Sequence, residues 1–326
     1  MDGRSLRSKR TSGWERYARE ISRASKVTVI PPFPLENVPL IGDLILALLL
    51  IGHRGIVHFP TFPPLLVKRH YIFTLHDLTW WLYPDTSSFL GKYFYKKLAE
   101  RALKKAFIVV PSQSVRGDLL SNFRVEDNRV FVVHNGLTVF RAESDLQSLN
   151  LPMKFILVVG TLEPRKNLHN FVSAFNDSNA KDDYKLVLVG RLGWGRIPPS
   201  VSVLSNLNDS ELAEVYKRAS AFFLPSIYEG FGLPLLEALA HRLPIFCSDI
   251  SVFREIGGNS CNYFDPRNIT EMVNALNSFV DGSYVRDKNN YQQDWKKYTW
   301  TSSGVNMREV YSRIGNALES SLHEKK

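Results

Sequence analysis

Short apolar runs alternate with amphipathic stretches along almost the whole chain, and this alternation constrains the fold more than any other feature of the sequence. In the second half, the apolar runs are four or five residues long and lack the apolar–polar alternation of a half-exposed strand. Such runs are typical of parallel strands that are buried on both faces and connected by helices. The predicted strands are 155–159, 185–189, 221–224 and 243–247, and the predicted helices are 167–177, 209–219 and 233–241.

The first half repeats this pattern, and the polar stretch 141–150 predicts a linker between the halves. A length of 326 residues also favours two domains. The predicted fold class is α/β, with Rossmann-like domains at 1–145 and 151–300 followed by a helix at 301–326. The predicted strands of the first half are 27–30, 55–59, 71–75, 107–110 and 129–133, and its helices are 14–25, 40–51, 89–105 and 112–122.

Two carboxylates eight residues apart, Glu229 and Glu237, flank the start of the helix predicted after strand 221–224. Gly230 and Gly232 between them allow the backbone to approach a ligand, and Pro234 suits the first turn of a helix. The N–H groups of a helix start favour an anion, whereas carboxylates repel a diphosphate and should accept hydrogen bonds from sugar or ribose hydroxyls. The alternative is that Glu237 only complements the helix dipole and Glu229 is a loop charge.

A basic pair, Arg165 and Lys166, follows strand 155–159 and the turn 160–164. The planar guanidinium and the lysine point charge are complementary ways to hold phosphate oxygens. A merely solvated basic pair is the less favoured interpretation, because positive charge at a helix start opposes the helix dipole.

Five segments in the same order resemble the family 4 glycosyltransferases, which are retaining enzymes of the GT-B fold. The segment that includes both carboxylates resembles the E-x7-E motif of that family. The other four resemble its glycine-containing first loop, its His-Asp element, the segment that closes the first domain, and its phosphate-contacting loop. In chain order the five segments are 11–17, 74–78, 132–136, 159–167 and 225–238.

The resemblance implies roles for individual residues. Catalytic roles fall to His76, near the donor sugar, and to Glu229, which would orient the transferred sugar. A structural histidine paired with Asp77 is the alternative for His76. The residues expected to bind the donor, with Glu237 on the ribose, are Gly13, Arg165, Lys166, Gly230, Phe231, Gly232, Leu233 and Glu237. The resemblance also implies a C-terminal helix that returns to brace the first domain, and a departing phosphate oxygen that takes the acceptor proton.

Two positions depart from the family pattern. The Asp-Gly-Arg element begins at Asp2, so the strand that normally precedes it appears to be missing. Many relatives have a basic residue where this chain has Thr161, which shifts more of the expected phosphate contact to Arg165 and Lys166.

The stretch 204–211 is expected to select the nucleotide base.

Positive charge is concentrated in the first half. Residues 1–150 contain 21 Lys+Arg and 13 Asp+Glu, a net of +8, whereas residues 151–326 contain 20 and 19, a net of +1. This asymmetry suggests an anionic partner, such as phospholipid headgroups or a lipid-diphosphate acceptor, and a merely basic solvated face is the equally weighted alternative. No nucleic-acid motif accompanies the charge, so nucleic acid is not the expected partner.

The remaining sequence signals predict a cytoplasmic protein without a metal or cofactor. The N-terminus lacks the apolar stretch of a signal peptide, and 40–51 is too short to span a bilayer. Cys247 and Cys261, the only cysteines, form no disulfide framework, and Cys247 is predicted to be a small core residue. No D-x-D triplet or His/Cys metal spacing is present, so the nucleotide-diphosphate sugar is expected as a co-substrate without a metal.

The leading hypothesis is a retaining transferase that moves a hexose, with mannose as the family-level expectation, to a glycan or lipid-linked acceptor in surface polysaccharide synthesis. A nucleotide-sugar epimerase of the GT-B fold and a non-catalytic sugar-nucleotide binder are the alternatives. A dehydrogenase is disfavoured because no G-x-G-x-x-G follows a first strand.

Overall fold

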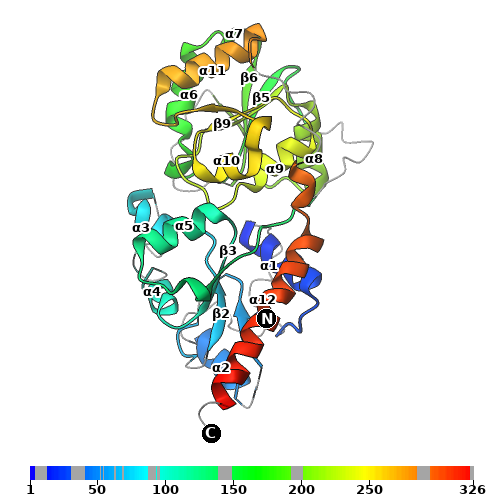
Figure 1. Cartoon of the computed structure of the whole chain (residues 1–326). Helices are drawn as coiled ribbons and strands as arrows, with labels where there is room; N and C mark the ends of the chain where they lie inside the picture. The colour runs from blue at the N-terminus through cyan, green and yellow to red at the C-terminus, as the bar shows by residue number, and fades with distance from the viewer. Residues whose placement is uncertain are drawn as a thin grey trace. The chain divides into compact units, whose positions relative to one another are not determined.

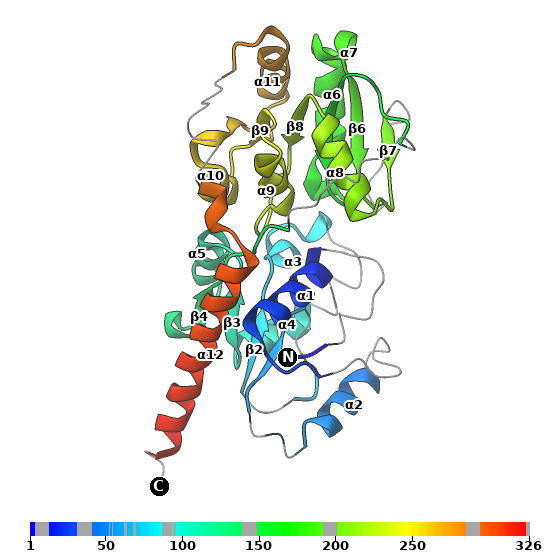
Figure 2. The same cartoon turned by 90° about the vertical axis from the view of Figure 1, so that its right-hand side faces the viewer.

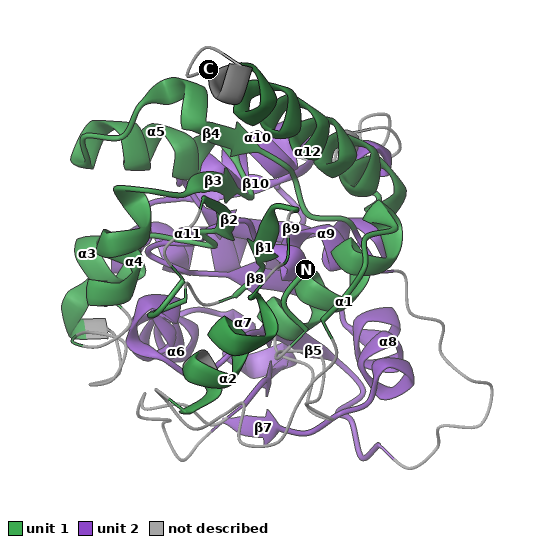
Figure 3. Ribbon diagram, turned by 90° about the horizontal axis from the view of Figure 1, so that it is seen from below, with its two compact units in different colours: residues 1–136, 298–326 green, residues 137–297 purple. Residues whose placement is uncertain are grey.

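The structure is a computed structural model, and it forms two compact units (Figures 1 and 3). Unit 1 comprises residues 1–136 and 298–326, and unit 2 comprises residues 137–297. The residues that the structure describes are 1–3, 13–30, 41–51, 53, 55–61, 64–67, 70–86, 93, 96–138, 149–191, 201–284 and 294–323. Each unit is an α/β layer structure with its own parallel sheet.

Unit 1 has a four-stranded parallel sheet in the order β1-β2-β3-β4 (Figure 3). Its strands have only three or four residues, and most of them are buried, as expected for a sheet covered on both faces. Its elements are α1 (Gly13–Ser25), α2 (Ile41–Leu49), β1 (Val57–Phe59), β2 (Tyr71–Thr74), α3 (Thr79–Leu82), η2 (Pro84–Thr86), α4 (Lys96–Leu103), β3 (Phe107–Val110), α5 (Gln113–Asn122), η4 (Asp127–Arg129), β4 (Val130–Val132) and α12 (Trp300–His323).

The long C-terminal helix α12 is part of the core of unit 1. It packs against α1, and Met307 and Ile314 lie in one hydrophobic cluster with Tyr17 and Ile21 of α1 and with Ile72 of β2. Ser303 Oγ also donates a hydrogen bond to the carbonyl of His134, 2.6 Å away, just after β4. Segments from both ends of the chain are therefore needed to complete this core.

Residues 1–3 make isolated strand-like contacts with residue 30 and with β1. Asp2 forms an isolated parallel bridge with Ile30, its N–H donates to the His58 carbonyl at 2.9 Å, and the Ile30 N–H donates to the Met1 carbonyl at 2.8 Å. The prediction of a regular strand at 27–30 was wrong, because its neighbour offers a single bridge instead of a ladder. Arg4 lies outside the described residues.

Unit 2 has a six-stranded sheet in the order β10-β9-β8-β5-β6-β7, in which all neighbours are parallel. Successive strands run outward from β5 in one direction and then, from β8, in the other. Doubly wound sheets bind ligands at this reversal, beyond the carboxyl ends of the strands. The elements are β5 (Phe155–Val159), η5 (Pro164–Lys166), α6 (Leu168–Asp177), α7 (Ala180–Asp183), β6 (Lys185–Val189), β7 (Ser202–Leu204), α8 (Asp209–Arg218), β8 (Ala221–Leu224), α9 (Leu233–Ala240), β9 (Ile245–Ser248), α10 (Ser251–Gly257), η6 (Gly258–Ser260), β10 (Asn262–Phe264), α11 (Ile269–Asp281) and η8 (Asp294–Lys297).

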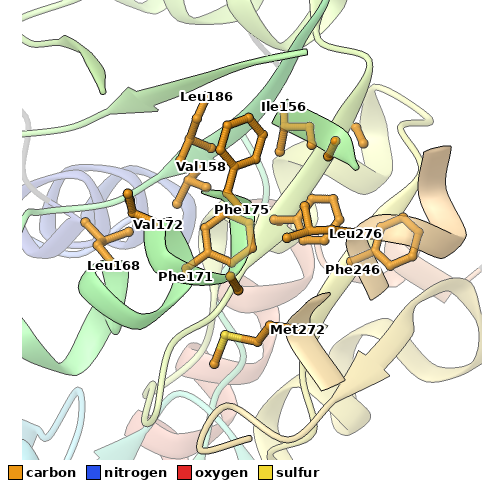
Figure 4. Close-up of a cluster of buried hydrophobic side chains, with 14 of the residues drawn as sticks. Ile156, Val158, Leu168, Phe171, Val172, Phe175, Leu186, Phe246, Met272 and Leu276 are labelled. Atoms are coloured by element: carbon orange, nitrogen blue, oxygen red, sulfur yellow. The ribbon is translucent and has the colours of Figure 1, made fainter. Parts of the chain in front are cut away.

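A core rich in phenylalanine holds α6 and α11 against the sheet of unit 2 (Figure 4). Phe171 of α6 packs on Phe223 of β8 with ring centroids 5.3 Å apart, and Phe223 stacks on Phe246 of β9 at 4.6 Å. Met272 and Leu276 of α11 complete this cluster. Because both helices are fixed on the sheet, the loops at its carboxyl edge start from rigid positions.

Most of the predicted elements are confirmed, and the misses have local causes. The structure has β5, β6, β8 and β3 with the predicted bounds, whereas β7 and β10 were not predicted because they are three-residue edge strands with polar residues. The helices α10 and α11 were also missed. Of the helix predicted at 89–105, residues 89–92 and 94–95 lie outside the described part. Among the helices that are described, none has the length and apolar character needed to cross a bilayer.

Candidate functional site

Two loops meet at the point in unit 2 where the strand order reverses. One follows β5 and contains the turn 160–163 and η5, and the other follows β8 and leads to α9. The N–H of Ile227 in the second loop donates to the carbonyl of Arg165 in the first, at 2.8 Å. This backbone bond joins segments that are 62 residues apart and brings their side chains together.

Arg165, Lys166 and Glu229 form one ion-paired cluster. Arg165 Nη1 donates to Glu229 Oε2 at 2.8 Å, and Lys166 Nζ donates to Glu229 Oε1 at 2.5 Å. Ser226 Oγ adds a third hydrogen bond to Oε1 at 2.8 Å, and Arg165 also pairs with Glu163 at 2.6 Å. The two cations predicted to hold phosphate and the carboxylate predicted to hold the sugar are therefore in direct contact.

The cluster is largely shielded from solvent, and this determines the charge state of Glu229. Lys166 and Glu229 are each only 7% exposed. Burial by itself would raise the pKa of Glu229, but the charges of Arg165 and Lys166, with their hydrogen bonds, lower it to about 2. Glu229 is thus ionised at neutral pH. A carboxylate has about four acceptor positions, and the three donors named above leave one on Oε2 for a further donor.

A small cavity lies directly beside this cluster. Its lining includes Gly160, Leu162, Lys166, Leu224 and Ser226, all at the carboxyl ends of β5 and β8. The stem of Lys166 runs over Gly160, since a Cβ built on Gly160 would lie 3.1 Å from the lysine Cε. The position of the ammonium group is therefore set by the turn after β5.

A second glycine, at the end of β6, supports the same turn. A Cβ on Gly190 would lie 1.8 Å from the Gly160 carbonyl oxygen, so only glycine fits there. Gly190 was missed by the sequence reasoning. Its signal is the apolar run of β6 ending in glycine, as the run of β5 does at Gly160.

The start of α9 has the geometry expected for close approach to a ligand. Gly232 precedes the helix with φ of 97°, in the left-handed region, and a Cβ there would lie 2.9 Å from the Phe253 ring. Pro234 lies in the first turn, and no side chain caps this helix end. Backbone N–H groups at an uncapped helix start favour a phosphate or another anion. Gly230, Phe231 and Leu233 lie in the same loop and helix start, as predicted.

Glu237 lies one turn into α9 and is 6% exposed. Its Oε2 accepts a hydrogen bond from the hydroxyl of Tyr216 on α8, at 2.8 Å, and the Tyr216 ring stacks on His241. Tyr216 was also missed, although its place in the predicted helix 209–219 was available as a signal. The predicted base-selecting stretch leads into the same helix, where Asn208 and Glu211 form a capping box.

In unit 1, His76 lies two residues beyond β2, at the carboxyl edge of that sheet. Its Nε2 donates to the carbonyl of Pro60 at 2.7 Å, since a carbonyl can only accept. Burial lowers its pKa, so the ring is neutral and Nδ1 is an acceptor. Trp14 stacks on the imidazole with centroids 5.7 Å apart, and Tyr17 meets it edge-on at 4.8 Å.

The hydrogen bonds around His76 argue against a simple pairing of its ring with Asp77. Its Nε2 is bonded to Pro60, and Asp77 Oδ1 accepts a hydrogen bond from the N–H of Thr79 at 2.9 Å.

Gly13, the other predicted site residue of unit 1, is the first residue of α1. A Cβ there would meet nothing within 4 Å among its neighbours. The predicted site residues are thus divided between unit 2, which brings Arg165, Lys166 and Glu229 into contact, and unit 1, which contains His76 and Gly13.

No metal-binding cluster accompanies these groups in the described part of the chain. None of its His, Cys, Asp and Glu side chains gather in threes in a way that could hold an ion. Metal independence stays a prediction. Cys247 is buried and free, as predicted for a core cysteine.

Two family models match consecutive parts of the chain. The model described as Glycosyltransferase Family 4 matches residues 10–139, and the model described as Glycosyl transferases group 1 matches residues 141–300. The boundary between the two matches falls near the end of the first segment of unit 1.

Relatives and solved structures agree with these matches. The O-antigen chain mannosyltransferase RfbU of Salmonella typhimurium is 29% identical over 247 residues, which cover 69% of this chain and 68% of RfbU. The serotype-specific mannosyltransferase WbdA of Escherichia coli is 32% identical over 173 residues, 48% of this chain, but the match spans only 21% of WbdA. The structure of Anabaena Alr3699/HepE in complex with UDP-glucose superposes with a TM-score of 0.66 at 16% identity, and the match covers 96% of this chain and 97% of that one.

Proposed function

Since the chain belongs to the family 4 glycosyltransferases and has the GT-B fold, we propose that it transfers a hexose from a nucleotide-diphosphate sugar, with retention of anomeric configuration. The acceptor is a glycan or a lipid-linked glycan in surface polysaccharide synthesis. RfbU and WbdA are named as mannosyltransferases, which favours mannose as the sugar. HepE was solved in complex with UDP-glucose, and the donor panel below therefore includes UDP-linked sugars.

The observation that carries the proposal is the cluster of Arg165, Lys166 and Glu229 where the strand order reverses. A departing nucleotide diphosphate gains negative charge in the transition state. Fixed cations next to an uncapped helix start stabilise that charge without reorganising. Because Glu229 already holds both cations in place, the diphosphate meets a preformed pair.

Glu229 would have a second task in this scheme. Its remaining acceptor position suits one hydroxyl of the transferred sugar. Such a bond would fix the sugar relative to the diphosphate that Arg165 and Lys166 hold, and correct relative placement of reacting groups is itself a large part of catalysis. Glu237, held by Tyr216, would accept from the ribose hydroxyls.

His76 supports hydroxyl recognition more than charge stabilisation. A neutral imidazole with Nδ1 as acceptor can accept a hydrogen bond from a sugar hydroxyl, but it carries no positive charge at neutral pH. No side chain is assigned as a general base. In the proposed retaining reaction the departing phosphate oxygen takes the proton of the acceptor hydroxyl as the new glycosidic bond forms.

The proposal includes neither a metal nor a cofactor, and it places the protein in the cytoplasm, where nucleotide sugars are made. The charge of +8 in residues 1–150 fits peripheral contact with an anionic membrane that presents the acceptor.

A thermal-shift panel with GDP-, UDP-, ADP- and dTDP-linked sugars, with and without EDTA, tests the site. One donor should raise the melting temperature, EDTA should not change the shift, and Arg165→Ala/Lys166→Ala should abolish it. The matched control is Lys181→Ala/Lys217→Ala, which removes two cations from the surface of the same unit. Each variant is first melted without ligand to establish that it is folded.

Transfer itself is then measured with the donor that binds. Sugar transfer or slow donor hydrolysis that is lost in Glu229→Ala supports the enzyme. Binding of one donor without turnover, with any acceptor extract, would instead indicate a non-catalytic sugar-nucleotide binder.

A further inference from the structure

Apart from Gly42 and Asp43, every residue of helix α2 in unit 1 is apolar, although one face of the helix is exposed. Leu46 is fully buried and Leu50, just past the helix, is 7% exposed, so this side packs on the unit. On the opposite side, Ile41, Leu44 and Leu48 are spaced by three and four residues, which places them on one helical face. Their exposures are 44%, 52% and 57%, and Ile51, two residues past the helix, is 75% exposed.

Such a face needs an explanation. A helix that is apolar all round is normally enclosed by protein or by lipid. Contiguous exposed apolar patches mark contact surfaces, whereas single exposed leucines do not. Asp43 is the only charged residue in the sequence of α2, so the helix lacks the polar face of an ordinary surface helix.

The topology places α2 beside a basic edge of unit 1. All four strands are parallel, so each segment that leads into a strand lies at the edge where the strands begin. The chain leads from α2 into β1, from α4 into β3 through residues 104–106, and into β4 through residues 123–129. Figures 1 and 2 both show α2 near the lower end of unit 1.

Exposed cations lie in these segments. Lys104 and Lys105 are exposed before β3, and Arg124 is exposed before β4. The acidic residues of the same edge, Glu126 and Asp127, are each paired with an arginine, Arg129 and Arg116. The described residues of this edge therefore carry more exposed positive charge than negative charge.

We propose that α2 inserts its exposed apolar face into the surface of an anionic membrane, with the basic edge of unit 1 on the lipid headgroups. This inference rests on the proposed function in that a lipid-linked acceptor requires the enzyme at a membrane. Nine residues of helix are about 14 Å long, too short to span the bilayer but suited to lying in its interface. A second copy of the chain fits less well, because two such edges would repel each other.

The test uses the full chain and unilamellar vesicles of phosphatidylcholine, alone or mixed with phosphatidylglycerol. We expect co-sedimentation with the mixed vesicles, weakened by salt. Leu44→Asp/Leu48→Asp should reduce partitioning about a hundredfold, since it removes apolar contact and adds charge that anionic lipid repels. The matched control is Met153→Asp/Val305→Asp, which changes two other exposed apolar residues in the same way and should bind normally.

A further double variant distinguishes the electrostatic contribution to vesicle binding from the contribution of apolar insertion. Lys104→Glu/Lys105→Glu should weaken binding to the mixed vesicles by about thirtyfold, at roughly 1 kcal/mol for each of the two cations, and leave the residual binding to phosphatidylcholine unchanged. Equal binding by wild type and Leu44→Asp/Leu48→Asp would overturn the proposal. So would a dimer in light scattering that this double variant dissociates, because α2 would then be a protein interface.

Failure of this inference is distinguishable from failure of the proposed function. Donor hydrolysis in solution needs no membrane, so Leu44→Asp/Leu48→Asp, Lys104→Glu/Lys105→Glu and the control should all hydrolyse donor at the wild-type rate. Vesicle binding should in turn persist in Lys166→Ala, whose change lies in unit 2.

Discussion

Tyr311 of α12 and His58 of β1 are hydrogen-bonded, with the phenol oxygen 2.8 Å from Nδ1, although 253 residues separate them in the sequence. The other nitrogen of His58, Nε2, lies 2.7 Å from Thr74 Oγ1, and Thr74 lies 3.1 Å from the Tyr17 hydroxyl. This buried polar chain links α12, β1, β2 and α1. Its last member, Tyr17, meets the ring of His76 edge-on.

Removing the Tyr311 hydroxyl should destabilise the protein. Tyr311→Phe leaves Nδ1 of buried His58 without this partner, which should lower the free energy of unfolding by about 1–2 kcal/mol. Urea denaturation measures the change. Tyr93→Phe is the control, since Tyr93 is 53% exposed, and it should change stability very little. Equal effects of both substitutions would refute a structural role for this bond.

His58 should make the protein acid-sensitive. Burial, with smaller effects of the N-terminal amine and His76, lowers the pKa of His58 from 6.5 to about 3. Below pH 6.5 the unfolded chain takes up a proton there and the folded chain does not. Stability should therefore fall as the pH drops through this window, by up to about 1.4 kcal/mol per pH unit from this group.

The direction of this pH dependence is tested with the variant His58→Gln. This variant should be less stable than wild type at neutral pH, and the difference should shrink as the pH is lowered to about 5, because the variant lacks the titrating group. Denaturation curves at both pH values give the comparison. A difference that is constant with pH would contradict a neutral, buried His58.

Glu229 should stabilise unit 2 down to strongly acidic pH. Glu229→Gln leaves Lys166 and Arg165 with reduced compensation, so the free energy of unfolding should fall by about 3 kcal/mol at neutral pH. The contribution of Glu229 is fully present above its ordinary pKa of 4.5 and is lost as the pH falls through about 2. Glu214→Gln is the control, because its partner Lys217 is 68% exposed, and it should cost less than about 0.5 kcal/mol.

The same substitution should separate binding from turnover. With Glu229→Gln the two cations keep their charge, so the nucleoside diphosphate should bind at least as tightly as to wild type. Transfer should nevertheless fall by about a hundredfold, because the sugar loses its ionised acceptor. Calorimetric titration and an activity assay measure the two quantities. A parallel loss of both would indicate that Glu229 acts only through folding.

Only glycine should be tolerated at position 232, because the backbone there is left-handed and a side chain would collide with Phe253. Gly232→Ala should lower the free energy of unfolding by about 1–2 kcal/mol because of left-handed strain, and further because the new Cβ would crowd the Phe253 ring. Gly282→Ala is a matched control for strain alone, since Gly282 has φ of 75° and open space at the Cβ position. Thermal denaturation should therefore show the larger loss for Gly232→Ala, and only this variant should also lose donor affinity.

Tyr216 should act through Glu237. Tyr216→Phe keeps the ring on His241 but removes the hydrogen bond to Oε2, which should raise KM for the donor about tenfold, or about 1.4 kcal/mol. The value of kcat should change less. Tyr184→Phe, in another part of unit 2, controls for loss of a phenol, and a similar rise in KM there would count against the assignment.

The sequence could predict the elements whose chemistry is local. The runs at β5, β6 and β8 are buried on both faces, so every residue is apolar except for Lys185 at one end, and the pattern has clear limits. By contrast, Ser202 of β7 and Asn262 of β10 lie in short edge strands, where pairing rather than composition decides the structure.

The candidate site was predictable as a set of residues but not as a set of contacts. The chain order shows Arg165, Lys166 and Glu229 at loops after strands, which is why these positions could be chosen. Their pairing depends on the backbone bond from Ile227 to Arg165, between loops far apart in sequence. No local pattern encodes that bond, and the same holds for the bond from Tyr216 to Glu237.

The place of α12 in unit 1 also sets an order for synthesis on the ribosome. Unit 2 is one continuous segment, residues 137–297, and can fold as soon as it leaves the exit tunnel. Unit 1 must wait for residues 298–326, because Met307 and Ile314 are part of its core. The first half of the chain is therefore synthesised first but completes its fold last. Until α12 is synthesised, the sides of Tyr17 and Ile21 that it covers lack their packing partners.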